Sequence, residues 1–219
     1  VVEGVVDRVD LLRRGKQRYV RVVDYKSGQK VFRLSDVYYG LNLQMLIYLF
    51  TLCDNGGEGM LPGGVLYMPA MAQVASVPRD ASPEAVRAEQ QKQLRMNGLL
   101  LEDRESLEAM EPGLAGVFIP AKLKKDGQFD AASPLANLAQ MGVIRRQVEK
   151  LLVGLAESLH SGQIQALPAQ KMGAPAHSPC EWCDYRSLCT HEEGDPVREL
   201  AELDRQEALQ AMKGGESSE

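Results

Sequence analysis

Residues 20–26 read VRVVDYK, a β-branched run that ends in an aspartate, a tyrosine and a lysine. Side chains alternate between the two faces of a strand, so Asp24 and Lys26 would lie on the same face. Removing such charges from water costs on the order of several kcal/mol unless each charge finds a partner or a metal ion. The run therefore predicts a strand with a functional site at its end.

The alternation of residues 1–26 predicts a β-hairpin. Gly15 and Lys16 can form its turn, with glycine at the first central position, as a type II′ turn prefers. Opposed residues then have numbers that sum to 31, so Asp7 would face Asp24, with Cβ atoms about 4.5–5.5 Å apart. Two carboxylates this close repel each other unless a cation lies between them. The predicted register therefore indicates a cation site.

Composition describes an ordinary globular domain, with 219 residues that are 44% hydrophobic and 25% charged. No apolar stretch reaches the roughly 18–20 residues that a membrane span needs, and no signal peptide opens the chain. The net charge of −5 argues against strong, non-specific nucleic-acid binding by this chain alone. The chain begins without methionine, inside an expected strand, and we interpret it as a piece of a larger protein.

The remaining pattern predicts an α/β fold in which helices flank a mixed sheet. A helix is expected from an N-cap at Ser35 to Leu52. The other expected elements are a strand over 65–68, a polar helix over 82–96, an element over 99–110, a short strand over 117–120, a basic hairpin around 124–127, a long helix over 134–160 and a charged helix over 196–212. Residues 1–195 would form the main domain, and 196–219 a charged helix with a disordered tail.

Asp7, Asp24 and Lys26 are the residue types that metal-assisted phosphodiester hydrolysis requires. Mg²⁺ is bound by one or two carboxylates together with water and substrate phosphate. A nearby lysine can position the attacking water or stabilise the charge that develops. The alternative is a surface hairpin with an ordinary ion pair, worth under about 1 kcal/mol.

Three motifs together resemble a known family. They are GVVD at 4–7, DYKSG at 24–28 and QMLIY at 44–48. Their order and spacing resemble the RecB-type branch of the PD-(D/E)XK nucleases. The resemblance implies a restriction-endonuclease-like core and a Mg²⁺- or Mn²⁺-dependent deoxyribonuclease.

The same resemblance implies a role for each motif residue. Asp7 and Asp24 would be metal ligands, with Tyr25 as a third position of the metal site. Lys26 would be the catalytic lysine. Gln44 and Tyr48 would orient the site or the DNA from one face of a helix; the alternative for these two is helix packing.

A second group of candidate residues is a cysteine cluster with the spacing C-x₂-C-x₅-C, formed by Cys180, Cys183 and Cys189. A disulfide framework is not expected in a chain of this length, so a metal site in a reducing cytosol fits better. Thiolates select zinc or iron–sulfur clusters, and both usually take four ligands. His177 or His191 could complete a zinc site, whereas Cys53 is expected to be a small hydrophobic residue in a buried helix.

The cysteine spacing also resembles the iron–sulfur members of the same nuclease branch. That resemblance implies a structural 4Fe–4S cluster held by Cys180, Cys183 and Cys189, with a fourth cysteine outside this chain. The branch carries a further acidic or histidine residue before the first strand, and this chain begins too late to contain it.

Over residues 1–195 the chain resembles the AddB-type nuclease domains most. The resemblance implies an exonuclease that acts on unwound DNA during double-strand break repair and recombination. It also implies an AddA-type helicase–nuclease partner, with ATP used by other parts of the complex. The alternatives are a Cas4-like nuclease and a catalytically degenerate, cysteine-stapled DNA-binding or docking module.

Overall fold

The computed structural model describes residues 3–28, 30–71, 76–172, 178–192 and 194–214. Its centre is a five-stranded sheet in the order β1-β2-β3-β4-β5. The strands are β1 (Arg8–Arg14), β2 (Gln17–Lys26), β3 (Met60–Pro69), β4 (Asn97–Leu101) and β5 (Leu135–Ala136). Pairs β1–β2 and β3–β4 are antiparallel, and pairs β2–β3 and β4–β5 are parallel. The sheet is therefore mixed, as expected.

The β1–β2 hairpin has the predicted register. Arg14 pairs with Gln17 and Arg8 pairs with Val23, so paired residue numbers sum to 31. Gly15 has a φ of 60°, a conformation that glycine adopts without steric cost and that the first central position of a type II′ turn requires. The strand pairing stops at Arg8, one residue after Asp7.

The prediction of a single helix from Ser35 to Leu52 is wrong. Two helices take its place, α1 (Leu34–Tyr38) and α2 (Gln44–Asn55). The chain between them passes through positive φ values at Gly40 (83°) and Asn42 (56°), which end a right-handed helix. Ser35 lies inside α1 and does not cap it.

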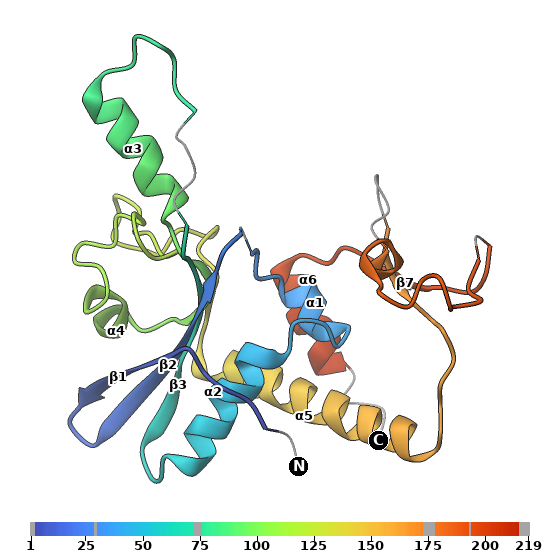
Figure 1. Ribbon diagram of the computed structural model, residues 1–219. Coiled ribbons are helices and arrows are strands. Elements are labelled where there is room, and N and C mark those ends of the chain that lie inside the picture. Colours follow the sequence, from blue (N-terminus) through green and yellow to red (C-terminus); the bar gives the residue numbers. More distant parts are fainter. Residues whose placement is uncertain (1–2, 29, 72–75, 173–177, 193, 215–219) are drawn as a thin grey trace.

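Two layers of apolar side chains cover the sheet, one on each face. Val22 points into the layer formed with α1, α2, α5 (Leu138–His160) and α6 (Arg205–Gly214). Its neighbour Val23 points into the layer formed with α4 (Arg104–Glu108) and the loop that follows α4. Figure 1 shows α2 and α5 on one side of the sheet and α4 on the other. Burial on both faces explains why the run in β2 is apolar almost throughout.

Helix α5 begins later than the expected 134–160 because residues 135–136 pair with β4. Asn137 then caps the helix, and Gln140 completes a capping box. The expected segment 99–110 divides into the end of β4 and α4. The polar helix is shorter than expected: α3 (Pro83–Gln93) has no buried residue and projects from the sheet (Figure 1).

The strand expected at 117–120 is absent from the described chain, where these residues form bends. The carboxylate of Glu111 holds them instead: it accepts the backbone N–H groups of Val117, Phe118 and Ile119 at 2.8–3.0 Å. A side chain thus satisfies backbone groups that a ladder would otherwise satisfy.

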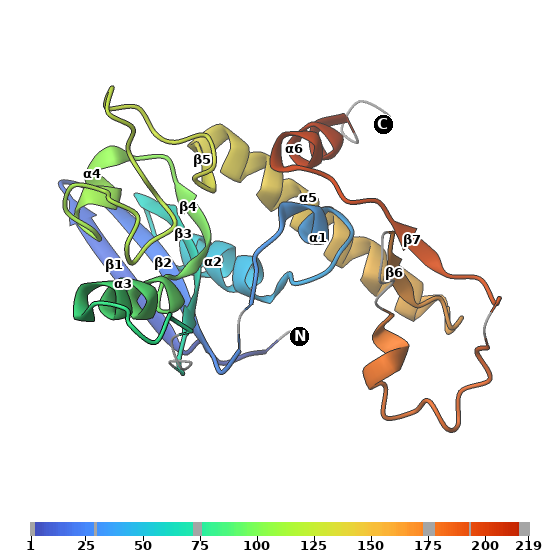
Figure 2. The ribbon, with the colours of Figure 1, turned by 90° about the horizontal axis from the view of Figure 1, so that it is seen from above.

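The C-terminal part begins with a small parallel sheet of β6 (Ala169–Lys171) and β7 (Arg198–Leu200). A short 3₁₀ helix, η1 (Pro179–Trp182), lies between them in sequence. The charged helix expected from residue 196 begins only at Arg205. This helix, α6, packs against α1 and α5 (Figure 2) and buries Ala208, Leu209 and Met212, so it completes the core. Residues 215–219 lie outside the described residues. None of the described helices is long and apolar enough to span a membrane.

Candidate active site and cysteine loop

The end of β2 brings Asp24 and Lys26 together. Asp24 is 9% exposed, and it pairs with Tyr67 of β3 just beyond the end of the β1–β2 pairing. The Nζ atom of Lys26 lies 2.5 Å from Oδ2 of Asp24. Oδ2 is buried, and apart from this ion pair it has no hydrogen-bond partner among the described residues. The ammonium of Lys26 is therefore the charge partner that this carboxylate has in the structure.

Asp7 reaches the same strand end from the start of the hairpin. Its Oδ2 accepts the backbone N–H of Tyr25 at 3.0 Å, and its side chain is exposed. This hydrogen bond ties the segment before β1 to β2, one residue beyond Asp24. Tyr25 therefore lies in the site through its backbone, with Asp7 on one side and Lys26 next in sequence.

Gln44 and Tyr48 lie one turn apart at the start of α2. The Nε2 atom of Gln44 donates to Oη of Tyr48 at 3.0 Å. The ring of Tyr48 lies against Gly4, where a Cβ atom would be 2.3 Å from the Tyr48 hydroxyl oxygen. The GVVD motif at 4–7 and the QMLIY motif at 44–48 are therefore in contact. The sequence reasoning missed the role of Gly4 in this contact. The signal available was its position three residues before Asp7.

Tyr67 of β3 forms the wall beside the aspartate–lysine pair. Burial raises the pKa of Tyr67, and the charges of Asp24 and Asp36 raise it further. The Lys26 ammonium lies 5.9 Å from the centre of the Tyr67 ring, within the range of a cation–π contact. Tyr67 therefore stays protonated at neutral pH and supplies an aromatic face to the lysine.

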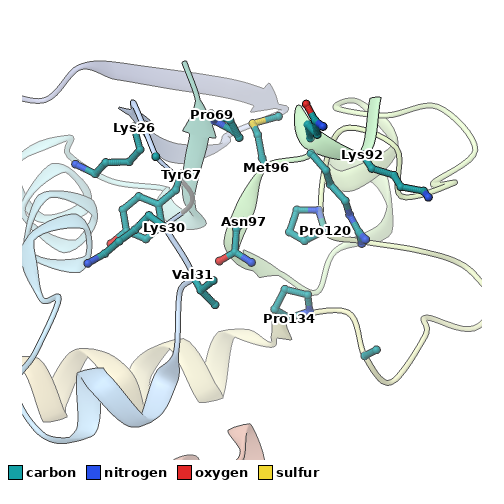
Figure 3. A pocket seen from close by; sticks show the side chains of 14 residues that line it. Lys26, Lys30, Val31, Tyr67, Pro69, Lys92, Met96, Asn97, Pro120 and Pro134 are labelled. Atoms are coloured by element: carbon teal, nitrogen blue, oxygen red, sulfur yellow. The ribbon is translucent and has the colours of Figure 1, made fainter. Parts of the chain in front are cut away.

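A cavity of about 430 Å³ opens beside Lys26 (Figure 3). We call it the basic trough, since four cationic side chains line it and no acidic one does. These cations are Lys26, Lys30, Lys92 and Arg95. In Figure 3, Lys26 and Lys30 lie on one side of the cavity and Lys92 on the other, with Asn97 between them. The trough connects the end of β2 with the end of α3.

The candidate metal ligands fit a hard divalent cation. Two carboxylates are within the usual protein share of Mg²⁺ ligands, because water and substrate phosphate fill the other positions. Oδ2 of Asp24 already lies against a cation, the ammonium of Lys26. Among the described residues, no group of three or more acidic, histidine or cysteine side chains is arranged to hold a metal on its own.

Residues 178–192, which we call the cysteine loop, line much of a second cavity, of about 250 Å³. Cys180, Cys183 and Cys189 all line it, together with His191. All three are free thiols. The ring of His191 contacts the carbonyl of Pro196 through Nε2 at 3.3 Å. His177, the other candidate for completing a zinc site, lies outside the described residues.

Cys53 lies on α2, where it packs against the core as a partly buried residue. Burial raises the pKa of its thiol to about 11, and the neighbouring charge of Asp54 adds to this effect. The thiol is therefore protonated at neutral pH, and Cys53 behaves as the small hydrophobic residue that the sequence indicated.

The comparisons with known proteins agree with this geometry. The family model of the PD-(D/E)XK nuclease superfamily matches residues 1–190. This chain belongs to the PD-(D/E)XK nuclease superfamily. The membership confirms the predicted fold class, a mixed sheet flanked by helices.

Curated relatives share one name, which describes the B-type subunit of an ATP-dependent helicase/deoxyribonuclease. The protein from Clostridium acetobutylicum is 33% identical over 100% of this chain and 19% of its own length. The protein from Clostridium novyi is 37% identical over 98% of this chain and 20% of its own length. The protein from Symbiobacterium thermophilum is 35% identical over 99% of this chain and 19% of its own length. The chain spans about a fifth of the length of these relatives.

Proposed function

We propose that this chain is the nuclease domain of an AddB-type helicase–nuclease subunit and hydrolyses phosphodiesters of unwound DNA. The observation that carries the proposal is the meeting of three residues at the end of β2: the buried carboxylate of Asp24 is paired with the ammonium of Lys26, and Asp7 is hydrogen-bonded to the next residue of the strand. Membership in the nuclease superfamily and the shared name of the relatives support it. Processing of double-strand breaks for recombination would be the task of the complete complex.

Asp7 and Asp24 would hold Mg²⁺ or Mn²⁺, with the backbone of Tyr25 between them. Such an ion, when bound, supplies Lewis-acid activation of water and neutralises charge on the phosphate. Lys26 would position the attacking water and stabilise the negative charge that develops on the phosphoryl oxygens. Gln44 and Tyr48 would keep the segment from Gly4 to Asp7 in place against α2, so we assign them a positioning role.

Three cysteines of the cysteine loop would be ligands of a structural 4Fe–4S cluster. The support is the C-x₂-C-x₅-C spacing and one cavity that Cys180, Cys183 and Cys189 all line. The three thiols are not already arranged around one metal position in the described part of the chain, so the cluster would draw them together. A fourth thiolate from another part of the longer protein would complete the set. The cluster would tie this loop to that part without redox chemistry in the nuclease reaction.

The acidic chain would depend on its complex for most of its DNA affinity. A net charge of −5 opposes binding to a polyanion. An AddA-type partner and the remaining part of the longer subunit would unwind the duplex with ATP and deliver single strands to the site. Such a complex would act in the cytoplasm.

The alternatives receive less support. The relatives carry a helicase/deoxyribonuclease name over almost the whole of this chain, which disfavours a Cas4-like nuclease. A degenerate docking module would have no use for a buried aspartate next to a lysine, a combination that is costly to keep without chemistry.

Substitution of Asp24 in the complete complex tests the proposal. Asp24→Ala should abolish cleavage of one DNA strand while ATP-driven unwinding continues. The matched control is Asp126→Ala, which removes an exposed aspartate of the basic hairpin and should change neither activity. Unchanged cleavage of both strands by Asp24→Ala would refute the proposed function.

A further inference from the structure

The basic trough holds a cation that is free to bind a ligand. The guanidinium of Arg95 is exposed, and it makes no hydrogen bond or ion pair with the part of the chain that the structure describes. Lys30, by contrast, donates to the side chain of Asn42 at 2.7 Å, and Lys92 pairs with Glu89 at 2.8 Å. Arg95 is therefore the trough residue whose charge most needs an external anion.

The trough also contains a hydrogen-bond acceptor without a donor. Oε1 of Gln93 is buried and accepts no hydrogen bond from the described residues. Such a group is costly to leave unsatisfied, so a ligand that brings an N–H group would be bound favourably once the Gln93 side chain turns its amide into the trough. Nearby, the side-chain oxygen of Asn97 accepts the N–H of Phe32 at 2.5 Å. This hydrogen bond fixes Asn97 in the wall of the trough.

The rest of the wall is apolar and suits a flat ring. Met96, Pro120 and Pro134 line the cavity beside Asn97 (Figure 3). An anion-binding guanidinium, an acceptor for an amino group and an apolar wall together match a nucleotide of adenine, cytosine or guanine, which carries a phosphate, an amino group and a planar base. A simple anion would use only the first of these features.

We propose that the basic trough binds the nucleotide next to the scissile phosphate of the single strand, with Arg95 on its backbone phosphate and Gln93 on the amino group of its base. This assignment rests on the proposed function, because the trough opens beside Lys26. The strand would then run from the end of β2 toward the end of α3. Helix α3 would serve the site by presenting Gln93 and the residues that follow it.

Replacing the charged phosphates of the substrate one at a time by uncharged linkages tests the contact with Arg95. The complete complex is given single-stranded oligonucleotides in which one phosphate at a time is replaced by a methylphosphonate. At one linkage beside the scissile phosphate, the native complex should lose about ten-fold in cleavage rate, as expected for a lost charge-assisted hydrogen bond. Arg95→Gln should show the same loss with ordinary DNA and no further loss at that linkage, because the two changes remove one contact.

The matched control is Arg87→Gln on α3. Arg87 is exposed and does not line the trough, so this variant should respond to every methylphosphonate as the native complex does. Gln93→Leu provides a second readout. The native complex should cleave more slowly when the flanking adenine is replaced by unsubstituted purine, which lacks the amino group, and Gln93→Leu should not distinguish the two.

The outcomes separate this proposal from the proposed function. Unchanged cleavage of both strands by Asp24→Ala refutes the proposed function and the trough with it. If Asp24→Ala abolishes cleavage of one strand but Arg95→Gln shows the same methylphosphonate profile as Arg87→Gln in the Asp24-dependent cleavage, only the trough assignment is overturned. A salt dependence of cleavage reduced by about one counterion in Arg95→Gln, and not in Arg87→Gln, supports the phosphate contact.

Discussion

Gly4 lies so close to Tyr48 that a Cβ atom at Gly4 would be 2.3 Å from the tyrosine hydroxyl oxygen and 2.7 Å from a ring carbon. Tyr48 cannot easily move away, because its hydroxyl accepts the side-chain N–H of Gln44. The glycine is needed for space, and its contact with α2 fixes where the chain enters the site. Asp7 follows three residues later.

Gly4→Ala should therefore slow DNA cleavage by displacing Asp7. A misplacement of about 1 Å can cost roughly 10²-fold in rate, and we expect a loss of ten- to a hundred-fold on this basis. Cleavage rates of the complete complex at saturating Mg²⁺ measure it. Gly154→Ala is the control, because a Cβ at that position of α5 meets nothing within 4 Å. Equal rates for the two variants would contradict the positioning role of Gly4.

The ion pair between Asp24 and Lys26 predicts a separation of stability from activity. Lys26→Met leaves a buried carboxylate without its cation and should lower the free energy of unfolding by about 1–3 kcal/mol. Asp24→Asn combined with Lys26→Met should recover most of that stability, since no unpaired charge remains. Urea unfolding of the 219-residue chain checks both variants. The double variant should remain inactive in the complete complex, and recovered cleavage would exclude Lys26 from the chemistry.

Glu111 predicts a loss of stability in acid. Burial alone would raise its pKa, but the N–H groups of Ile119, Val117 and Phe118 outweigh burial, so the pKa of Glu111 is lowered in the folded chain. The ionised Glu111 therefore contributes fully to the free energy of unfolding above its unfolded-state pKa of about 4.3. This contribution is lost as the pH falls through the lower pKa that Glu111 has in the folded chain. Glu111→Gln should be less stable by about 1–3 kcal/mol at pH 7, and its stability should fall less steeply in acid. Unfolding curves at several pH values test this, and an unchanged slope would contradict it.

The sequence predicted what depends on near neighbours. The hairpin register followed from alternation and from glycine at position 15, because both signals are local. The break between α1 and α2 was missed because Gly40 and Asn42 lie in a run with helical apolar spacing. The loop held by Glu111 was read as a strand, since an apolar run does not reveal which group satisfies its backbone.

Contacts between distant segments were harder to predict. The basic trough joins residues near position 30 to residues near 95, and nothing in either segment indicates the other. Gly4 and Tyr48 stand in separate motifs, and only the fold shows that they touch. The three cysteines were recognised from their spacing, because their ligand pattern lies within ten residues.

The cysteines predict two classes of thiol reactivity. Because burial raises the pKa of Cys53 to about 11, little thiolate is present at pH 8, and alkylation of Cys53 should be slow. Cys183 and Cys189 are exposed, so in cluster-free protein they should be modified first, as peptide mass analysis can show. In the full-length protein purified without oxygen, Cys183→Ser should lower the iron content, whereas Cys53→Ser should leave it unchanged. A loss of iron in Cys53→Ser would instead make Cys53 the fourth ligand, and it would require that α2 and the cysteine loop meet.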